Sequence, residues 1–427
     1  MSDLKCTAYN GPHGSGYGRP SKFLNDIPND TGGDQQFAER GKKSLHIFFQ
    51  NISCRPIFIQ RPEGSYYFFM LMETILVTPL IGMGDTLMTT PALRLIKTRF
   101  PDWKLTYFTI SHSNYELLKG NPFIDSLWYY PLKSAGILNG PLHILKNISG
   151  KYSTSLTFYP ANRVAYNLFA LLTGAKKRIG HNYLHRNLTQ LNWLKNRTIT
   201  EDPNAHCVEE NIRLLSCLGI TCEKNDIPPM EIFLTQQEME AGRSFREGIG
   251  AVTVVGVHAG TSTFKNQSKR RWPKERFIEL INRFPDYRFL LLGTKEEEDI
   301  NRFIMSNAAD EKHITLVGNR PLRETIAIIG QCDAFVSNDS GLMHIAAAMK
   351  IPTLALLGPT NPAFIYPWRT RHKLIRTGIE CSPCYYYSPK PLSCVRHIDY
   401  RCMTEMSVET VEDGLMELME SKKKAKV

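Results

Sequence analysis

Short apolar runs alternate with helical patterns along the chain from residue 72 onward. Short runs of apolar residues are typical of buried strands, whereas apolar residues that recur every three or four positions are typical of helices. In the first half, the runs predict strands at residues 74–78, 104–109, 126–130 and 155–158. The helical pattern predicts helices at residues 86–99, 115–119, 164–172 and 207–218.

A second series with the same alternation begins near residue 253. The predicted strands lie at residues 253–258, 287–292, 314–317, 334–337 and 353–357. The predicted helices lie at residues 274–284, 296–306, 322–330 and 340–349, and a last helix is expected at 408–420. Strands that alternate with helices form parallel sheets through right-handed crossovers. The fold class is therefore predicted to be α/β, with two such units.

Composition sets the expected domain boundaries. Residues 1–71 are rich in Gly, Pro, Asn and Asp up to Arg40, and show only strand-like runs at 46–49 and 57–59. We expect this part to be a poorly ordered upstream extension that folding and activity do not require. We then expect a first domain at 72–222, a linker region at 223–250, a second domain at 251–406, and a final helix with a basic tail at 407–427.

The bulk properties narrow the class of protein. The chain has 427 residues, a net charge of +11 and 10 cysteines. It holds no apolar run of about 18 residues, so no membrane span is expected, and it lacks the usual signal-peptide layout. The scattered cysteines indicate a reducing cytoplasm. The positive charge favours an anionic partner, which leaves nucleotide phosphate, a phosphorylated glycolipid, an anionic membrane face and nucleic acid as options.

The segment from Val336 to His344 predicts a phosphate site. An apolar run stops at Asn338, and an Ala-rich helical stretch follows. Asp339 or Ser340 can cap the helix, and Gly341 allows a ligand to approach the backbone. Free N–H groups and the helix dipole then favour an anion, and His344 lies one turn inside the helix. The alternative is an ordinary strand-to-helix turn with a satisfied histidine.

A similar strand, glycine loop and helix start occurs near residue 82. Gly82, Met83 and Gly84 form a loop whose backbone can pass close to a sugar or hydroxyl group. Asp85 follows as either a helix N-cap or a general base. The glycine spacing does not match the dinucleotide-binding fingerprint.

Small residues and positive charge lie close together in the second unit. Ligands of parallel sheets bind at the carboxyl ends of strands, and Gly260, Thr261 and Ser262 follow the predicted strand at 253–258. They offer small side chains and hydroxyls for a diphosphate. Lys269 and Arg270 come shortly afterwards, either as a phosphate contact or as a solvated basic loop.

Five ordered motifs together resemble the heptosyltransferases of glycosyltransferase family 9. They are Ile81–Leu87 with Pro91–Leu93, His258–Ser262, Arg270–Pro273, Asn338–His344 and Gly358–Pro362. The resemblance covers the chain from about Met72 to the end. It implies a GT-B fold, in which two Rossmann-like domains enclose a cleft and the last helix packs on the N-terminal domain. It also implies an inverting enzyme that transfers heptose from ADP-heptose to the inner core of lipopolysaccharide.

The resemblance assigns expected roles to the candidate residues. Asp85 is the expected base for the acceptor hydroxyl, and helix-end amides, Arg270 and His344 stabilise the leaving diphosphate without a divalent ion. No catalytic cofactor is therefore expected. Asp339 binds donor-sugar hydroxyls or is only a cap. The family usually has lysine where this chain has Arg270, which leaves open whether Lys269 or Arg270 meets the phosphate.

Two further features have open interpretations. The family holds the nucleotide ribose with an acid after a strand, and Glu297 fits this spacing, unless it only begins an exposed helix. Four cysteines share a spacing that suits a structural zinc or iron site in a loop at 381–402: Cys381, Cys384, Cys394 and Cys402. Relatives that modify autotransporters carry iron in such a cluster. Reduced packing cysteines or a disulfide are the alternatives.

The expected partners are a nucleotide-sugar donor, a phosphorylated glycolipid acceptor and an anionic membrane surface. The protein is then cytoplasmic, with a peripheral position at the inner face of the cytoplasmic membrane as one option. An alternative is the same fold with another nucleotide sugar or a protein acceptor. Nucleic-acid binding through the cysteine loop is the third reading, but it leaves the cleft motifs unexplained, so no nucleic acid is expected.

Overall fold

The computed structural model describes residues 57–60, 66–69, 73–132, 134–318, 320–385 and 391–424. The chain divides into two compact units, Met1–Leu71 and Met72–Val427. In the first unit, β1 (Ile57–Gln60) pairs antiparallel with β2 (Tyr66–Phe69). The strand-like run at 46–49 lies outside the described residues.

The first half of the second unit holds a parallel sheet with the strand order β5-β4-β3-β6-β7-β8. Its strands are β3 (Thr74–Val77), β4 (Lys104–Thr109), β5 (Ser126–Tyr129), β6 (Thr154–Leu156), β7 (Lys177–Asn182) and β8 (Arg197–Thr200). Its helices are α2 (Met83–Leu87), α3 (Thr90–Arg99), α4 (His112–Leu118), α5 (Gly136–Asn147), α6 (Val164–Leu172) and α7 (Cys207–Leu214). Leu76, Phe108, Ile144 and Phe169 form a core between the sheet, α5 and α6.

The second half repeats this order as β11-β10-β9-β12-β13-β14, again all parallel. Its strands are β9 (Thr253–His258), β10 (Tyr287–Leu291), β11 (Ile314–Leu316), β12 (Ala334–Asn338), β13 (Thr353–Leu356) and β14 (His372–Ile375). Its helices are α8 (Gln236–Ile249), α9 (Lys274–Asn282), α10 (Glu298–Asn307), α11 (Leu322–Ile329), α12 (Gly341–Ala348), α13 (Pro362–Ile365), α14 (Arg401–Thr404) and α15 (Val408–Lys424).

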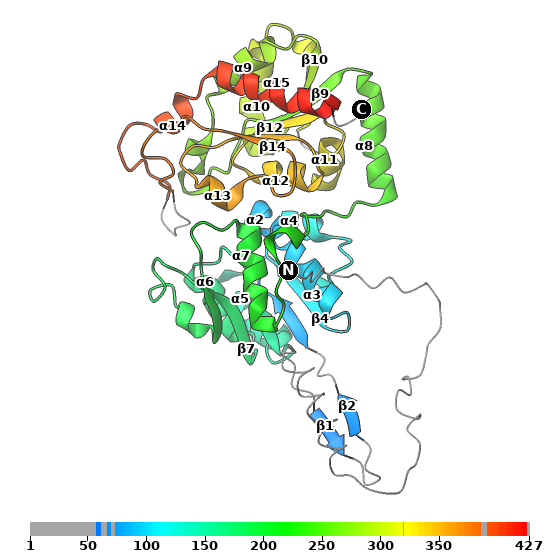
Figure 1. The fold of residues 1–427 in the computed structure, drawn as a ribbon, viewed down its shortest axis with the longest axis vertical. Coiled ribbons are helices and arrows are strands. Elements are labelled where there is room, and N and C mark those ends of the chain that lie inside the picture. Colours follow the sequence, from blue (N-terminus) through cyan, green and yellow to red (C-terminus); the bar gives the residue numbers. More distant parts are fainter. Residues whose placement is uncertain are drawn as a thin grey trace, which may run out of the picture. The chain divides into compact units, whose positions relative to one another are not determined.

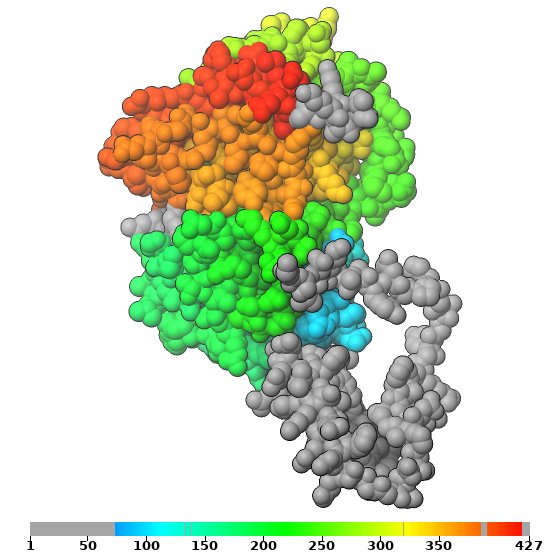
Figure 2. Space-filling model, viewed as in Figure 1, coloured from blue at the N-terminus to red at the C-terminus, as the bar shows by residue number. Residues whose placement is uncertain are grey.

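The two sheets share one topology, and it positions the site. In each sheet the first strand in sequence lies in the middle. Successive strands are added on one side of it and then on the other, so the strand order reverses between β3 and β6 and again between β9 and β12. Ligands of such sheets bind outside the carboxyl ends of the strands at this switch point. Helices α2 and α12, which follow β3 and β12, contact each other where the two halves meet (Figure 1). The space-filling view shows the two halves of residues 73–424 abutting along that boundary (Figure 2).

The α/β class with two parallel sheets is confirmed, and several local predictions were wrong. The helix predicted at 86–99 is divided into α2 and α3, because Thr89 and Thr90 turn their hydroxyls to the carbonyls of Thr86 and Leu87 at 2.7 and 2.8 Å. Such side-chain bonds compete with the helical ladder, and Pro91 then favours a new helix start. Helix α8 occupies much of the range that we expected to be a linker.

The last helix does not pack where the resemblance implied. Val408, Val411, Leu415 and Leu418 of α15 belong to the core of the second half. A Cβ atom at Gly414 would lie 2.8 Å from Cδ1 of Ile375, so glycine allows α15 to lie close against the second sheet. The expectation that this helix packs on the N-terminal domain is therefore wrong.

No helix among the described residues is both long and apolar enough to cross a membrane.

Candidate functional site

A cavity of about 1330 Å³ lies at the facing switch points of the two sheets. Both halves of the second unit line it. Most of the residues singled out from the sequence are among its walls: Gly82, Met83, Gly84, Asp85, Thr261, Ser262, Arg270, Glu297, Asp339, Ser340, Gly341 and His344. Gly260 and Lys269 are not. The structure thus brings together two loops that are far apart in the sequence.

Asp85 lies in the first turn of α2 and does not cap it. The N-cap position belongs to Gly82, and no side chain bonds to the free amides there. Burial and the negative charge of Asp339 raise the pKa of Asp85 to about 6, against the opposing effect of Arg270 and Arg163. Asp85 is therefore an ionised carboxylate at neutral pH with a pKa close to the working range of a general base.

Gly82 makes room for this carboxylate. A Cβ atom at position 82 would lie 2.6 Å from Oδ2 of Asp85. The sequence pattern had assigned the glycines of this loop only to ligand approach, whereas the structure gives Gly82 a second task, which is to leave the side chain of Asp85 in place.

The start of α12 lacks a side-chain cap. Ser340 occupies the N-cap position, but its hydroxyl makes no bond to the helix amides. Instead, Ser340 Oγ lies 2.8 Å from Nδ1 of His258 and 3.1 Å from Oγ of Ser337. Uncapped amides and the positive end of the helix dipole at a cavity wall suit an anionic group such as phosphate.

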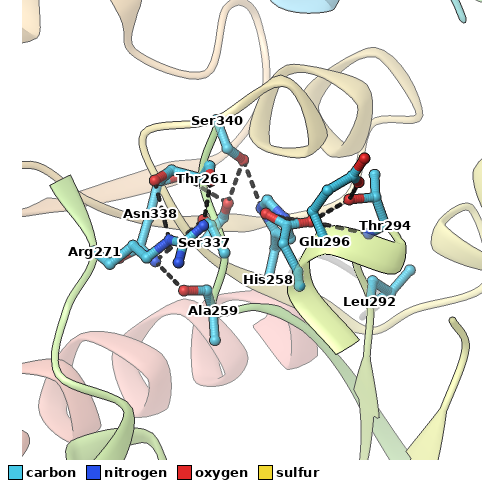
Figure 3. A network of polar contacts seen from close by, with 12 residues as sticks. His258, Ala259, Thr261, Arg271, Leu292, Thr294, Glu296, Ser337, Asn338 and Ser340 are labelled. Carbon is cyan, nitrogen blue, oxygen red and sulfur yellow. Dashed lines mark hydrogen bonds and ion pairs between the residues drawn. The ribbon is translucent and has the colours of Figure 1, made fainter. Parts of the chain in front are cut away.

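His258 connects Ser340 to a buried carboxylate. Its Nε2 lies 3.2 Å from each carboxylate oxygen of Glu297, and Figure 3 shows His258 between Ser340 and the Thr294–Glu296 segment. Burial raises the pKa of Glu297, but the hydrogen bond and charge of His258 and the amide of Thr294 outweigh it and hold that pKa at about 2. Because Glu297 is a carboxylate, Nε2 of His258 carries a proton and donates it.

Gly260 also serves this network. A Cβ atom there would lie 1.9 Å from Oε1 of Glu297, so the carboxylate packs directly over the glycine backbone. Gly260 therefore accommodates Glu297 behind the cavity wall. The neighbouring Glu296 is exposed; it lines the cavity and accepts a bond from Thr294 Oγ1 at 2.6 Å.

The three consecutive basic residues at 269–271 make three different contacts. Arg270 forms an ion pair with Asp339 at the cavity wall. Lys269 instead lies with Nζ 5.6 Å from the ring centroid of Tyr400. Arg271 donates from Nε to Thr261 Oγ1 at 3.3 Å. Of Lys269 and Arg270, Arg270 is thus the one that lines the cavity.

Asp339 and His344 differ from what the motif suggested. Asp339 accepts from Arg270 and, at 2.7 Å, from Thr360 Oγ1, so it joins a charge cluster and does not cap α12. Burial lowers the pKa of His344 to about 4 although Asp339 opposes this, so the ring is neutral at pH 7. Its Nδ1 is buried without a hydrogen-bond partner in the described part of the chain.

Arg163 and Tyr166 are among the cavity residues that the sequence analysis missed. Arg163 and Tyr166 line the cavity from the start of α6, and the charge of Arg163 acts on Asp85. They follow β6, whose position at the switch point is the signal that the sequence offered. The segment Pro160–Val164 resembles no glycine loop, so its sequence indicates no ligand-binding motif.

The four cysteines of the 381–402 loop do not support a metal site. Across the described ranges, no group of three or more His, Cys, Asp or Glu side chains is placed to hold a metal ion, and all four thiols are free. Cys402 lies in the core beside Met403 and Met406. Burial, with the nearby Cys384, Cys381 and Cys394, raises the pKa of Cys402 to about 11. Cys402 thus fits the packing alternative, and the expected structural zinc or iron is not supported.

Comparison with known sequences gives one consistent family. The sequence model of glycosyltransferase family 9 (heptosyltransferase) matches residues 159–392, which is more than half of the chain. Lipooligosaccharide heptosyltransferase 2 of Haemophilus influenzae is 31% identical over 36% of this chain and 46% of its own length. Lipopolysaccharide heptosyltransferase 3 of Escherichia coli is 26% identical over 67% of this chain and 82% of its own. The match thus spans less than half of the first relative.

Two solved structures share the fold. A glycosyl transferase family 9 protein from Veillonella parvula has a TM-score of 0.64 and 20% identity, over 82% of this chain and 97% of that one. The E. coli ADP-heptose lipopolysaccharide heptosyltransferase II has a TM-score of 0.63 and 20% identity, over 82% and 100%. These likenesses confirm the GT-B fold. With the matching family model, they lead to one conclusion: this chain belongs to glycosyltransferase family 9.

Proposed function

We propose that the protein is an inverting glycosyltransferase that moves heptose from ADP-heptose to the inner core of a lipopolysaccharide acceptor. The observation that carries this proposal is the placement of Asp85 and the uncapped start of α12 in one cavity, each contributed by a different half. The donor and acceptor classes come from the relatives, which are lipopolysaccharide and lipooligosaccharide heptosyltransferases.

The proposed reaction is a direct displacement. An acceptor hydroxyl gives its proton to Asp85 while its oxygen bonds to the anomeric carbon of the heptose. The bond from that carbon to the diphosphate oxygen breaks, and its electron pair leaves with ADP. A general base contributes roughly 100- to 10,000-fold in rate. A pKa of about 6 supports this role, because Asp85 is ionised at pH 7 yet basic enough to accept a proton.

The leaving diphosphate needs positive charge and hydrogen-bond donors on the opposite side. The amides at the start of α12 and the Arg270 guanidinium provide both. Arg270 already faces Asp339, so its charge is held at the cavity wall before a ligand arrives. His344 is neutral at pH 7 and contributes as a hydrogen-bonding ring.

The nucleotide ribose is assigned to an acid after β10. The sequence favoured Glu297, but both of its oxygens are engaged by His258 and Thr294. Glu296 is exposed at the cavity and has one oxygen bonded only to its neighbour Thr294. We therefore assign the ribose contact to Glu296 and a positioning role to Glu297.

The partners follow from this reaction. The donor is a nucleotide sugar, and the acceptor is a phosphorylated glycolipid whose charge suits a chain of net charge +11. We place the protein in the cytoplasm, at the inner face of the cytoplasmic membrane where a lipid-anchored acceptor is accessible.

The decisive assay measures ADP release from purified protein given ADP-heptose and a heptose-deficient lipopolysaccharide. The wild type should release ADP only when acceptor is present, and Asp85→Asn should reduce this by 100-fold or more. Asp286→Asn, an exposed acid outside the cavity, is the matched control and should retain full activity. A well-folded wild type that releases no ADP would redirect the search to another nucleotide sugar or a protein acceptor.

A further inference from the structure

One segment carries nearly all of the net charge of the chain. Residues 126–200 contain ten Lys and Arg residues and no Asp or Glu, whereas the whole chain has a net charge of +11. This segment includes β5 to β8 and the helices α5 and α6. Lys195 is buried, Arg163 lines the cavity and Lys177 pairs with Glu73. The other basic residues supply positive charge that attracts an extended anionic partner.

Helix α5 adds an exposed apolar stripe to this charge. Leu138, Leu142 and Leu145 are 77%, 60% and 49% exposed, and their spacing of four and three residues puts them on one side of the helix. Ile144, on the opposite side, is buried in the core. The helix is thus apolar on its outer side as well, where a surface helix normally carries polar residues.

The neighbouring elements continue the stripe. Helix α6 packs beside α5 and has no charged residue; its Leu168 and Leu171 are exposed (Figure 1). The loop after β7 is tied to α6 by Asn167, which donates to Gln190 O at 2.6 Å. This loop exposes further large apolar side chains: Leu184, Leu188 and Trp193.

We propose that this leucine face, formed by the exposed leucines of α5 and α6 with Leu184, Leu188 and Trp193, docks on an anionic lipid bilayer. Exposed basic residues accompany it: Lys146, Lys151, Lys176 and Arg186. Leucines and tryptophan that enter the headgroup region, with Lys and Arg beside them, are the pattern of interfacial binding. A protein partner usually carries both acidic and basic side chains, and residues 126–200 offer no Asp or Glu to pair with its basic ones.

The position of the leucine face extends the proposed function. It rests on that function in one respect, which is that the acceptor is anchored in a lipid membrane. The start of α6 contributes Arg163 and Tyr166 to the cavity, while its outer side carries Leu168 and Leu171. A bilayer at the leucine face therefore brings the cavity close to the membrane surface, where a lipid-anchored acceptor presents its sugars.

Vesicle binding of the full chain tests the proposal. Wild type should co-sediment with vesicles of phosphatidylglycerol and phosphatidylcholine, bind at least tenfold more weakly to phosphatidylcholine alone, and be released by salt. The variant Leu138→Gln/Leu142→Gln/Leu145→Gln should bind at least tenfold more weakly than wild type. A matched triple variant at exposed apolar positions elsewhere, Met239→Gln/Val252→Gln/Met416→Gln, should bind like wild type.

Trp193 reports on the contact directly. Its emission should shift to shorter wavelength with anionic vesicles, and Trp193→Phe should remove that shift. Absence of wild-type binding, or equal binding by both triple variants, would overturn the proposal. A dimer that the α5 variant dissociates would assign the face to a second copy and overturn it as well. Transfer to a water-soluble, deacylated acceptor should be unchanged in the α5 variant, so a failure of membrane docking remains distinguishable from a failure of the proposed reaction.

Discussion

The ring of His344 leaves no room for a side chain at position 84: a Cβ atom on Gly84 would lie 2.6 Å from Cδ2 of His344. The reverse contact is also close, since a Cβ atom on Gly341 would lie 3.3 Å from Cβ of Met83. Helices α2 and α12 thus meet through two glycines, and this contact sets how near Asp85 comes to the start of α12.

Gly84→Ala should therefore separate the two helices. Overpacking at a buried contact costs about 1 to 3 kcal/mol, and the buried ring of His344 cannot easily move away. We expect a lower free energy of unfolding in urea and a loss of at least tenfold in kcat. Gly248→Ala, at a helix position with no atom within 4 Å of the added Cβ, is the matched control and should be neutral or stabilising. Wild-type kcat in Gly84→Ala would contradict the role of this contact.

The pKa of Asp85 predicts how the rate depends on pH. If Asp85 is the base, kcat/KM should be constant above pH 6 and fall about tenfold per pH unit below it, because the protonated carboxyl cannot accept a proton. Asp339→Asn removes a negative charge that raises this pKa. Its rate should be lower, since Arg270 loses its partner, but the midpoint of the profile should also move to lower pH. A midpoint that stays in place would show that another group is being titrated.

The same raised pKa predicts a stability gain when the charge is removed. The pKa of Asp85 is about 6 in the folded chain against 3.8 normally, so the folded state binds the proton more tightly, and ionised Asp85 destabilises it above pH 6. Asp85→Asn should stabilise by about 2 to 3 kcal/mol at pH 8. The gain should vanish near pH 3, below both pKa values, where both states hold the proton.

Urea unfolding at the two pH values measures this difference. Asp286→Asn, at the surface, should show no such gain at pH 8. An inactive Asp85→Asn protein that is more stable than wild type would identify a site whose function costs stability. Equal stability of the two proteins at pH 8 would mean that Asp85 is better solvated than its surroundings suggest.

The sequence predicted the buried strands and the switch-point loops well, for a physical reason. Central parallel strands such as β9 and β12 are buried on both faces, so they read as apolar runs. The strands β7 and β8 lie at one end of their sheet and consist largely of polar residues, so no apolar run marked them and the prediction missed them. Helix α5 was missed because Gly140 and Pro141 lie inside it.

At the site, the sequence did not predict which way individual side chains point. Spacing placed two acids after β10 but gave no indication of which one turns inward, because that depends on where the helix begins. The capping interaction of Thr294 with Glu297 decides it and leaves Glu296 outside. A similar signal was overlooked at Thr235 and Glu238, whose capping box begins α8 inside the range that we expected to be a linker.

The pair of His258 and Glu297 yields the last prediction. Glu297→Gln removes a buried carboxylate whose two oxygens accept from His258, and it leaves the imidazole without its charged partner. Breaking a buried pair costs about 3 to 5 kcal/mol. Because the pKa of Glu297 is lowered to about 2, the stabilisation is complete above pH 4.5 and is lost as the pH falls toward 2. The variant should therefore be less stable than wild type at pH 7 and similar to it near pH 2.

Kinetics separate a positioning role from a purely structural one. Without Glu297, His258 no longer holds Ser340 at the start of α12, so KM for the nucleotide sugar should rise while KM for the acceptor stays constant. Gly260→Ala should have the same effect, since its Cβ atom would lie 1.9 Å from Oε1 of Glu297. Glu298, the next residue, pairs with Arg302, and Glu298→Gln is the control that should change neither constant. A rise in both KM values would mean that the network supports the whole cavity and not the donor side in particular.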